Sequence, residues 1–472
     1  MESTGRRVFL KALAGAAAAA LPSFGRGRSG DPNIVFILAD DLGWADLPCY
    51  GNAFNEAPNL DRLAREGMRF TDAYAAGPVC SPTRASILSG QYPARCGITD
   101  FIPGYWLPYE KLRTPLNRQS LPLEAVTLAE AMKPAGYACG MFGKWHLGGK
   151  PFYPDRQGFD AMLVSSGWGH FLPPAVTDPK LGVPEGSYLA EVLTERAERF
   201  LEENRRRPFF LLLNHFAVHI PLEARNALIE KYQAKPRPAS GVNNPVYAAM
   251  VEHVDASVGR IVRKLDELGL ADDTVVVFFS DNGGLYRETF VYKEYNPTTN
   301  TPLRSEKGSL YEGGIRVPLV VRWPGTVKPG SLCREPVSSV DFYPTFLEMA
   351  GLDPPFGHPL DGRSLLSLWK EKGRPKRDAI YWHYPHYHHT SPAGAIRRGD
   401  WKLIEFFEDG RLELYHVRED MSERRNLAGV HPERAAGLRK KLAEWRVSVN
   451  ADMPEPNPDY DPARRMELGR HP

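Results

Sequence analysis

Continuous apolar stretches, each about as long as one strand, alternate along this chain with amphipathic helical stretches. Apolar runs lie within residues 33–44, 188–216, 273–284 and 313–325, and helical patterns cover 58–70, the first part of 125–146, and 248–270. A continuous apolar run is typical of a strand buried on both faces, as in a parallel sheet. Alternation of such strands with helices favours a layered architecture. We therefore predict an α/β fold with a large, mostly parallel sheet sandwiched by helices.

The pattern changes after about residue 365, where short strand patterns separated by turns replace the alternation. A last helical pattern covers 431–449, and a Pro-rich stretch follows it. We expect a main α/β domain over residues 31–365 and a smaller antiparallel α+β domain over 366–452. Residues 453–472 are expected to form an extended tail.

The first 28 residues have a different character. Arg6 and Arg7 precede an Ala-rich apolar stretch that ends in small residues. This order is typical of a bacterial twin-arginine export signal, so we assign residues 1–28 to one and expect a periplasmic or secreted protein. The apolar stretch is short and contains Lys11, which does not suit a membrane span. No other stretch resembles a span, so we expect a chain that does not cross the membrane.

Charge and cysteine content exclude several other classes. The chain has 59 basic and 57 acidic residues, a net charge of +2, and no basic block in its body, so nucleic acid is not an expected partner. Its five cysteines form no C-x-x-C pair, which gives no support to a zinc site or a redox pair. An exported chain with these cysteines has room for one or two disulfides.

The stretch VCSPTRASILSGQYPARCG, residues 79–97, places a cysteine directly before Ser-Pro at a predicted helix start. Pro82 suits a first helical turn, and Gly90 suits a helix end. Cys80 then lies at the helix N-terminus, where free N–H groups and the helix dipole favour an anion. Two interpretations follow: a reactive thiol, or a small buried thiol at a loop–helix junction.

Polar residues follow two of the predicted strands. Asp40 and Asp41 come after the first strand, and Asp281 and Asn282 come after a later one. Open α/β sheets bind ligands at the carboxyl ends of their strands. Three carboxylates and an amide oxygen form a hard oxygen set suited to Ca²⁺ or Mg²⁺. Each pair taken alone is equally explained as a turn or a helix cap.

Basic side chains occur at similar places. Lys144 and His146 lie two residues apart in GKWHLG, which on an extended segment puts both on one side. His219 follows another predicted strand, and Lys307 lies in a glycine-rich stretch before a further one. A lone His or Lys at such a position is usually solvated. Arg84, Lys144 and Lys307 near the Cys80 helix start would together form a cradle for an anion.

Together these motifs resemble the type I, formylglycine-dependent sulfatase family of the alkaline-phosphatase-like superfamily, in particular sequences of the arylsulfatase A and N-acetylgalactosamine-6-sulfatase kind. The family signature C-x-P-x-R corresponds to residues 80–84, followed by Ser89 and Gly90. The motifs DD, CSPTR, GKWH, HIP, DNG and EKG occur in the family's order, and the similarity runs from about Pro32 to the end of the C-terminal domain. Ser89, where Thr is commoner, and Ile220 in the HIP motif are mild departures.

The resemblance implies a specific role for Cys80. In this family the motif cysteine is oxidised to formylglycine by a formylglycine-generating enzyme that recognises C-x-P-x-R. Hydrated formylglycine is a geminal diol: one hydroxyl attacks sulfur and releases the substrate alcohol. The second hydroxyl then loses its proton, the aldehyde re-forms and sulfate leaves, so nucleophilic catalysis is split into two steps.

The resemblance also implies roles for the other polar residues. One Ca²⁺ ion would bind Asp40, Asp41, Asp281 and Asn282 together with the modified Cys80, and Asp281 is a candidate to accept the proton of the attacking hydroxyl. Arg84 and Lys144 would position the formylglycine, and His146 would take the proton of the second hydroxyl. His219 and Lys307 would bind sulfate, and one of them would protonate the leaving oxygen.

Substrate choice is expected from residues outside that set. Residues 100–119 contain Tyr105, Trp106 and Tyr109, and residues 381–402 contain a histidine-rich tract from which we select His388 and His389 as candidate substrate contacts. Aromatic faces and histidines suit a sulfated sugar. We therefore expect a sulfated carbohydrate or aryl sulfate as substrate, and an exo-acting enzyme on sulfated galactose or N-acetylgalactosamine.

Two alternatives stay open on the sequence alone. One is a phosphoesterase or phosphonate hydrolase of the same superfamily. The other is a sulfated-glycan binding protein in which Cys80 stays unmodified. Comparing turnover and binding between the wild-type protein and Cys80→Ala would separate the second alternative from an enzyme.

Overall fold

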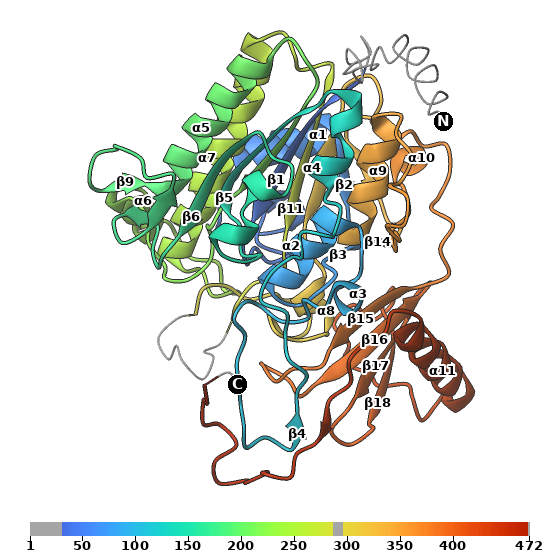
Figure 1. The fold of residues 1–472 in the computed structure, drawn as a ribbon. Helices are drawn as coiled ribbons and strands as arrows, with labels where there is room; N and C mark the ends of the chain where they lie inside the picture. Colours follow the sequence, from blue (N-terminus) through green and yellow to red (C-terminus); the bar gives the residue numbers. More distant parts are fainter. Residues whose placement is uncertain (1–30, 287–295, 471–472) are drawn as a thin grey trace, which may run out of the picture.

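A nine-stranded sheet forms the centre of the computed structural model, which describes residues 31–286 and 296–470 (Figure 1). The strand order is β13-β2-β12-β11-β1-β10-β5-β6-β8. Its five central strands run parallel: β11 (Thr274–Ser280), β1 (Asn33–Ala39), β10 (Phe209–Asn214), β5 (Ala138–Lys144) and β6 (Ala161–Ser166). The predicted large, mostly parallel sheet is confirmed. The predicted export signal at residues 1–28 lies outside the described residues.

Antiparallel neighbours flank this parallel centre. On one side β12 (Leu319–Arg322) pairs antiparallel with β11 and with β2 (Met68–Phe70), and β13 (Ser331–Cys333) lies outside β2; on the other side β8 (Val176–Asp178) pairs antiparallel with β6. The stretch 313–325, predicted as one strand, instead contains α8 (Glu312–Ile315) and β12. Gly313 and Gly314 are the reason, because both lie so close to the carbonyls of residues 304–309 that a side chain would not fit.

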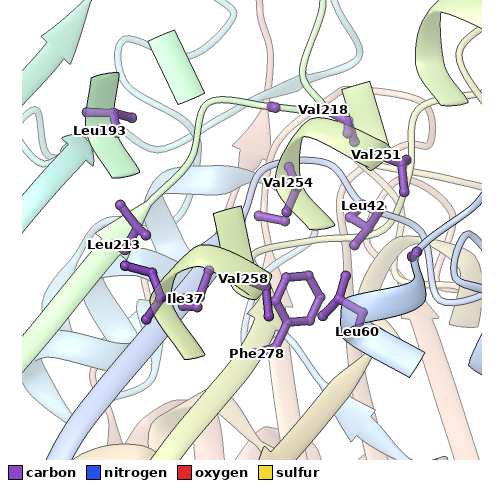
Figure 2. Close-up of a cluster of buried hydrophobic side chains, with 14 of the residues drawn as sticks. Ile37, Leu42, Leu60, Leu193, Leu213, Val218, Val251, Val254, Val258 and Phe278 are labelled. Atoms are coloured by element: carbon purple, nitrogen blue, oxygen red, sulfur yellow. The ribbon is translucent and has the colours of Figure 1, made fainter. Parts of the chain in front are cut away.

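Helices cover both faces of the sheet, and each face has its own hydrophobic core. One face carries α1 (Pro58–Glu66), α5 (Leu189–Asn204), α6 (Asn226–Ala234) and α7 (Pro245–Glu267); the other carries α2 (Cys80–Ser89), α4 (Leu128–Ala131), α9 (Phe342–Met349) and α10 (Leu366–Trp369). Val35 and Ile37 of β1 belong to the first core, part of which is drawn in Figure 2, and Ile34 and Phe36 belong to the second. Because strand side chains alternate between faces, a continuous apolar run fills both cores.

The helix expected in the first part of 125–146 is much shorter than its apolar pattern suggests. It consists of α4, only four residues long, and a 3₁₀ turn over Lys133–Ala135. Pro134 lacks the N–H that would continue an α-helix, and Gly136, with φ of 78°, ends the turn before β5. The chain thus enters β5 with little helix before it.

The C-terminal part is a four-stranded antiparallel sheet covered on one face by α11 (Pro432–Ser448) (Figure 1). Its strands are β15 (Ile380–Tyr384), β16 (Ala393–Arg398), β17 (Trp401–Phe406) and β18 (Leu412–His416). Ile396 and Leu403 face α11, whereas Ala395 and Ile404 pack in a cluster with Tyr74 of the main part. The predicted smaller antiparallel α+β unit is confirmed.

Short elements complete the fold. They are β3 (Ala73–Tyr74) with β14 (Val337–Ser338), β7 (Phe171–Leu172) with β9 (Ser187–Tyr188), β4 (Leu112–Arg113) with β19 (Glu455–Pro456), and α3 (Pro93–Cys96). Within the described ranges, none of the helices combines the length and the apolar character that a membrane crossing requires. All five cysteines are free thiols, so the disulfides for which the sequence has room do not form here.

A buried ammonium group connects the C-terminal sheet to the main part. Lys402 of β17 is completely buried, and its Nζ lies 2.9 Å from Oε1 of Glu312 and 2.9 Å from Oε1 of Glu423. Glu312 belongs to α8 and also accepts a hydrogen bond from the hydroxyl of Tyr74 at 2.7 Å. Each of these buried charges depends on its partners, because an unpaired ion is costly to bury.

We expect Lys402→Met to destabilise the fold by about 3 kcal/mol, because it leaves two buried carboxylates without the ammonium that they share. Urea unfolding followed by tryptophan fluorescence measures the loss. Lys441→Met is the control: its ammonium pairs with Asp378 near the surface, and such exposed pairs contribute about 0–1 kcal/mol. Equal losses for the two variants would refute the role given to Lys402.

Candidate active site

The predicted polar residues meet at the carboxyl edge of the parallel strands. Asp40 and Asp41 follow β1, Asp281 follows the neighbouring β11, and Lys144 is the last residue of β5. Ala39 and Ser280 are paired in register, so the acidic pairs after them emerge side by side. The backbone N–H of Asp41 donates to Oδ1 of Asp281 at 3.2 Å, which ties the two strand ends together.

Cys80 faces these carboxylates as the first residue of α2. Its Sγ lies 3.2 Å from Oδ1 of Asp40 and 3.5 Å from Nζ of Lys144, and the residue is only 1% exposed. Burial and the negative charge of Asp40 raise the pKa of the Cys80 thiol well above its usual range. The unmodified thiol is therefore protonated at neutral pH, which argues against the interpretation of Cys80 as a reactive thiolate.

Arg84 and Lys144 neutralise the carboxylates beside Cys80. Arg84 donates to Oδ2 of Asp281 from Nε at 2.9 Å and approaches it with Nη2 at 2.7 Å, while Nζ of Lys144 lies 2.5 Å from Oδ2 of Asp40. Burial opposes the charge of Asp40, but Lys144 and Arg84 hold the pKa of that carboxyl well below its usual range. For Asp281, burial and the charge of Asp40 raise the pKa.

Lys307 and His219 surround Asp41. Nζ of Lys307 lies 2.7 Å from Oδ2 of Asp41, and Nε2 of His219 lies 3.6 Å from the same oxygen. Burial opposes the charge on Lys307, but the charge of Asp41 raises its pKa. Burial and Lys307 lower the pKa of His219 to about 4. At neutral pH, Lys307 is therefore a cation and His219 is a neutral imidazole.

His146 lies just beyond β5 with its ring orientation set by a backbone carbonyl. Its Nε2 is 2.6 Å from the oxygen of Ile102, so the neutral ring donates from Nε2 and carries its lone pair on Nδ1. Nδ1 is buried and has no hydrogen-bond partner in the structure. Burial and the charge of Lys144 lower the pKa of His146 well below its usual range. No sequence signal marked Ile102 as the residue that orients this ring.

The carboxylates and one amide oxygen at the strand ends fit a hard divalent cation. Asp40, Asp41, Cys80 and His219 each offer one ligand atom, and these atoms lie within 4.8 Å of one another. The amide of Asn282 donates to Asp41 at 2.7 Å, while its carbonyl Oδ1 is buried with no hydrogen-bond partner in the structure. An orphaned oxygen beside clustered carboxylates is what a Ca²⁺ or Mg²⁺ site provides. The resemblance implied that His219 binds sulfate; in the structure His219 lies next to Asp41 and also lines the cavity described below.

A cavity of about 590 Å³ opens above this cluster. Cys80, Lys144, His146, His219 and Lys307 line it together with aromatic side chains that include Phe101, Tyr105 and Trp168. Trp168 was not predicted; it is 47% exposed, and its ring lies edge-on to that of His219 at 5.9 Å. Its one signal in the sequence is a tryptophan between two glycines.

The candidate substrate contacts divide into two groups. His388 and Tyr105 line the cavity, with ring centroids 5.3 Å apart. His389 is not in the lining; its Nδ1 lies 2.6 Å from the backbone oxygen of Lys307. Trp106 and Tyr109 are also outside the lining. The structure thus brings together one histidine and one aromatic residue of the predicted set.

Comparison with known proteins agrees with this geometry. The sulfatase family model matches residues 32–352, and the model for the C-terminal part of N-sulphoglucosamine sulphohydrolase matches residues 305–448. Arylsulfatase A of Homo sapiens is 33% identical, over 94% of this chain and 92% of its own. N-acetylgalactosamine-6-sulfatase of Sus scrofa is 32% identical, over 84% of this chain and 76% of its own.

A solved structure gives the same result. The structure of Ps i-CgsB in complex with k-i-k-neocarrahexaose superposes with a TM-score of 0.76 at 29% identity, over 91% of this chain and 94% of that one. The chain belongs to the sulfatase family. It is a sulfuric ester hydrolase with the alkaline-phosphatase-like sulfatase fold, as the motifs predicted.

Asp100, behind the cavity wall, generates a pH prediction. Its buried carboxylate accepts from the Tyr384 hydroxyl at 2.8 Å and the Phe101 N–H at 2.9 Å, and burial raises its pKa to about 7. A carboxyl with a raised folded-state pKa binds its proton more tightly when folded, so stability falls as the pH rises from about 4 to about 7.

Asp100→Asn keeps an acceptor oxygen but removes this titration. We expect the variant to gain about 2–4 kcal/mol relative to wild type between pH 4 and pH 8, measured by urea unfolding at both values. Asp459→Asn, at an exposed position, serves as the control. A stability difference that does not change with pH would show that Asp100 does not titrate in this range.

Proposed function

We propose that this sulfatase hydrolyses carbohydrate sulfate esters with a formylglycine made from Cys80 and one Ca²⁺ ion. The position of Cys80 carries the proposal: it lies at the N-terminus of α2, in the cavity lining, beside Asp40 and Lys144. A buried thiol with a raised pKa is a poor nucleophile there. The hydrated aldehyde supplies one hydroxyl that attacks sulfur and a second whose deprotonation expels sulfate.

The residues around the modified side chain have distinct tasks in this proposal. Arg84 and Lys144 hold it in place, since both are buried cations at the Cys80 side of the site. Asp281, fixed by Arg84, takes the proton of the attacking hydroxyl. His146 takes the proton of the second hydroxyl through Nδ1, the nitrogen left free by the contact with Ile102.

Sulfate itself is bound opposite Cys80. Lys307 is a buried cation and His219 a neutral imidazole, and both line the cavity next to Asp41. One of the two protonates the leaving oxygen. Asp40, Asp41, Asp281, Asn282 and the modified Cys80 would hold Ca²⁺, and the ion would supply a positive charge that offsets the charge developing on the sulfate oxygens.

The cavity supports a sugar as substrate. Its volume suits a single ring with its sulfate, and the faces of Phe101, Tyr105 and Trp168 suit stacking against a pyranose. We propose an exo-acting enzyme on sulfated galactose or N-acetylgalactosamine that also accepts aryl sulfates, and His388 as a contact to the sugar. His389 then contributes indirectly, by contacting the backbone oxygen of Lys307 and not the sugar. Release of sulfate from chain ends, compared with internal cleavage of sulfate from a polymer, tests the exo mode.

We also propose that residues 1–28 direct export by the twin-arginine route to the periplasm or the medium. That route carries folded chains, so the buried Cys80 must be converted in the cytoplasm by a formylglycine-generating enzyme. Conversion that a mass-tag chase detects only after export would contradict this order.

The first test is the mass of the tryptic peptide that contains Cys80, from a host with the modifying enzyme. We expect a mass about 18 Da below that of the thiol peptide, the change from thiol to aldehyde that formylglycine chemistry requires. Cys80→Ala protein from the same host is expected to bind sulfated sugar but not to turn it over. An unmodified thiol would favour the binding-protein alternative, and preferential turnover of phosphate or phosphonate esters would favour the phosphoesterase.

Removal of the cation provides a second test. Prolonged dialysis against EGTA is expected to lower the turnover of para-nitrophenyl sulfate at least about 100-fold, and Ca²⁺ is expected to restore it, since losing Lewis-acid stabilisation costs several kcal/mol. Asn282→Ala removes the orphaned oxygen and should raise the Ca²⁺ concentration needed for recovery. Turnover that EGTA leaves unchanged, in protein shown by elemental analysis to be free of metal, would exclude the cation.

A further inference from the structure

One wall of the cavity belongs to a segment that extends away from both sheets. We call residues 101–113 the rim loop and residues 453–470 the C-terminal tail. Residues 101–105 line the cavity. The rest of the loop runs outward to β4. In Figure 1 the tail, in dark red, passes beside β4, with which its own strand β19 pairs.

The tail donates hydrogen bonds to five backbone carbonyls in the outer part of the rim loop. The carbonyls of Trp106, Pro108, Tyr109, Glu110 and Lys111 all accept hydrogen bonds from it. Nδ2 of Asn457 donates to Pro108 at 2.8 Å and to Glu110 at 2.7 Å, and its backbone N–H donates to Lys111 at 3.1 Å. The N–H groups of Asp461 and Gly469 donate to Tyr109 at 3.2 Å and to Trp106 at 2.9 Å.

Side chains strengthen the same contact. The carboxylate of Glu110 is 2% exposed, and Arg465 of the tail lies 3.1 Å from it. The guanidinium of Arg464 lies over the ring of Tyr109 at 3.6 Å. At Gly469 the backbone is so close to Trp106 that a Cβ atom would lie 2.8 Å from the indole. The buried carboxylate of Glu110 needs the guanidinium of Arg465 as its partner, because an unpaired carboxylate is costly to bury.

The part of the rim loop that the tail holds adjoins the cavity wall. Trp106, whose carbonyl accepts from Gly469, directly follows Tyr105, whose ring packs against those of Phe101 at 4.9 Å and His388 at 5.3 Å. Leu107 and Leu112 pack against Tyr387, the neighbour of His388. Tail, rim loop and the His388 segment therefore form one packed unit on a single side of the cavity.

We infer that the C-terminal tail is a specificity element: by fixing the rim loop, it sets the affinity for the part of the substrate beyond the sulfate. The sulfate position itself is formed by Lys307 and His219, which the tail does not touch. Ordering a loop of this length costs conformational entropy that the tail contacts offset. The identity of the ligand in this inference rests on the proposed function. The contact between the tail and the rim loop is independent of that function.

The test uses the full chain with the double substitution Asn457→Ala/Gly469→Val, which removes two side-chain hydrogen bonds to the rim loop and forces the tail away from Trp106. Met466→Ala, at an exposed tail position, is the matched control. Hydrogen exchange measured by mass spectrometry on peptides from residues 105–113 reports the loop without any ligand. We expect exchange at least about 10-fold faster in the double variant, because local opening there becomes cheaper.

Binding is measured in a Cys80→Ala background, so that no turnover interferes. The double substitution is expected to raise the Kd of para-nitrophenyl sulfate about fivefold, while the Kd of inorganic sulfate stays within twofold, because only the first ligand extends beyond the sulfate site. A merely structural tail would change both values or neither.

Two outcomes would overturn the inference. In the first, hydrogen exchange of the rim loop is the same in the double variant as in the protein with an intact tail. In the second, exchange is faster in the double variant, but the ratio of the two Kd values does not change. Failure of the proposed function has a different signature. In that case neither ligand binds to protein with an intact tail, and formylglycine-bearing wild-type protein does not hydrolyse para-nitrophenyl sulfate.

Discussion

Three carboxylates and three strong cations meet below the cavity. The rest of the site depends on their neutralising one another, because these charges are buried. Asp40 contacts Lys144 and Arg84, Asp281 contacts Arg84, and Asp41 contacts Lys307. Buried ions are tolerated only when they are paired, so removing Lys307 would take from Asp41 the ammonium that neutralises it. For Asp40 this pairing holds the pKa well below its usual range, so that carboxylate is ionised and able to hold a cation.

This arrangement needs a parallel sheet. Parallel strands end at a common edge, so the residues after β1, β11 and β5 meet although they are far apart in sequence. The continuous apolar strands fill two cores, which hold that edge rigid. The helix that carries Cys80 is buried along its whole length, so its N-terminus is held as firmly as the strand ends.

The C-terminal part completes the cavity rather than standing apart from it. It supplies His388 to the wall, and Lys402 joins its sheet to α8, the short helix that follows the Lys307 segment. The tail beyond α11 returns to the rim loop and donates hydrogen bonds to five of its backbone carbonyls. The cavity wall is thus built from both parts of the chain, whereas the polar residues at the strand ends come from the main part alone.

Local sequence was sufficient for the central strands β1, β10 and β11, for the α2 start at Cys80 and for the polar residues after β1 and β11, because apolar periodicity and helix-end residues act within a few positions. It failed where a proline or a close approach between segments overrides an apolar pattern, as at Pro134 and at Gly313. Which distant residues contact each other was decided only by the folded chain: Lys307 and Asp41, or Gly469 and Trp106, are separated by hundreds of residues. The same holds for the Ile102 carbonyl that orients His146 and for the approach of His219 to Asp41. Such contacts depend on how the layers pack, and no residue pattern within one segment records that.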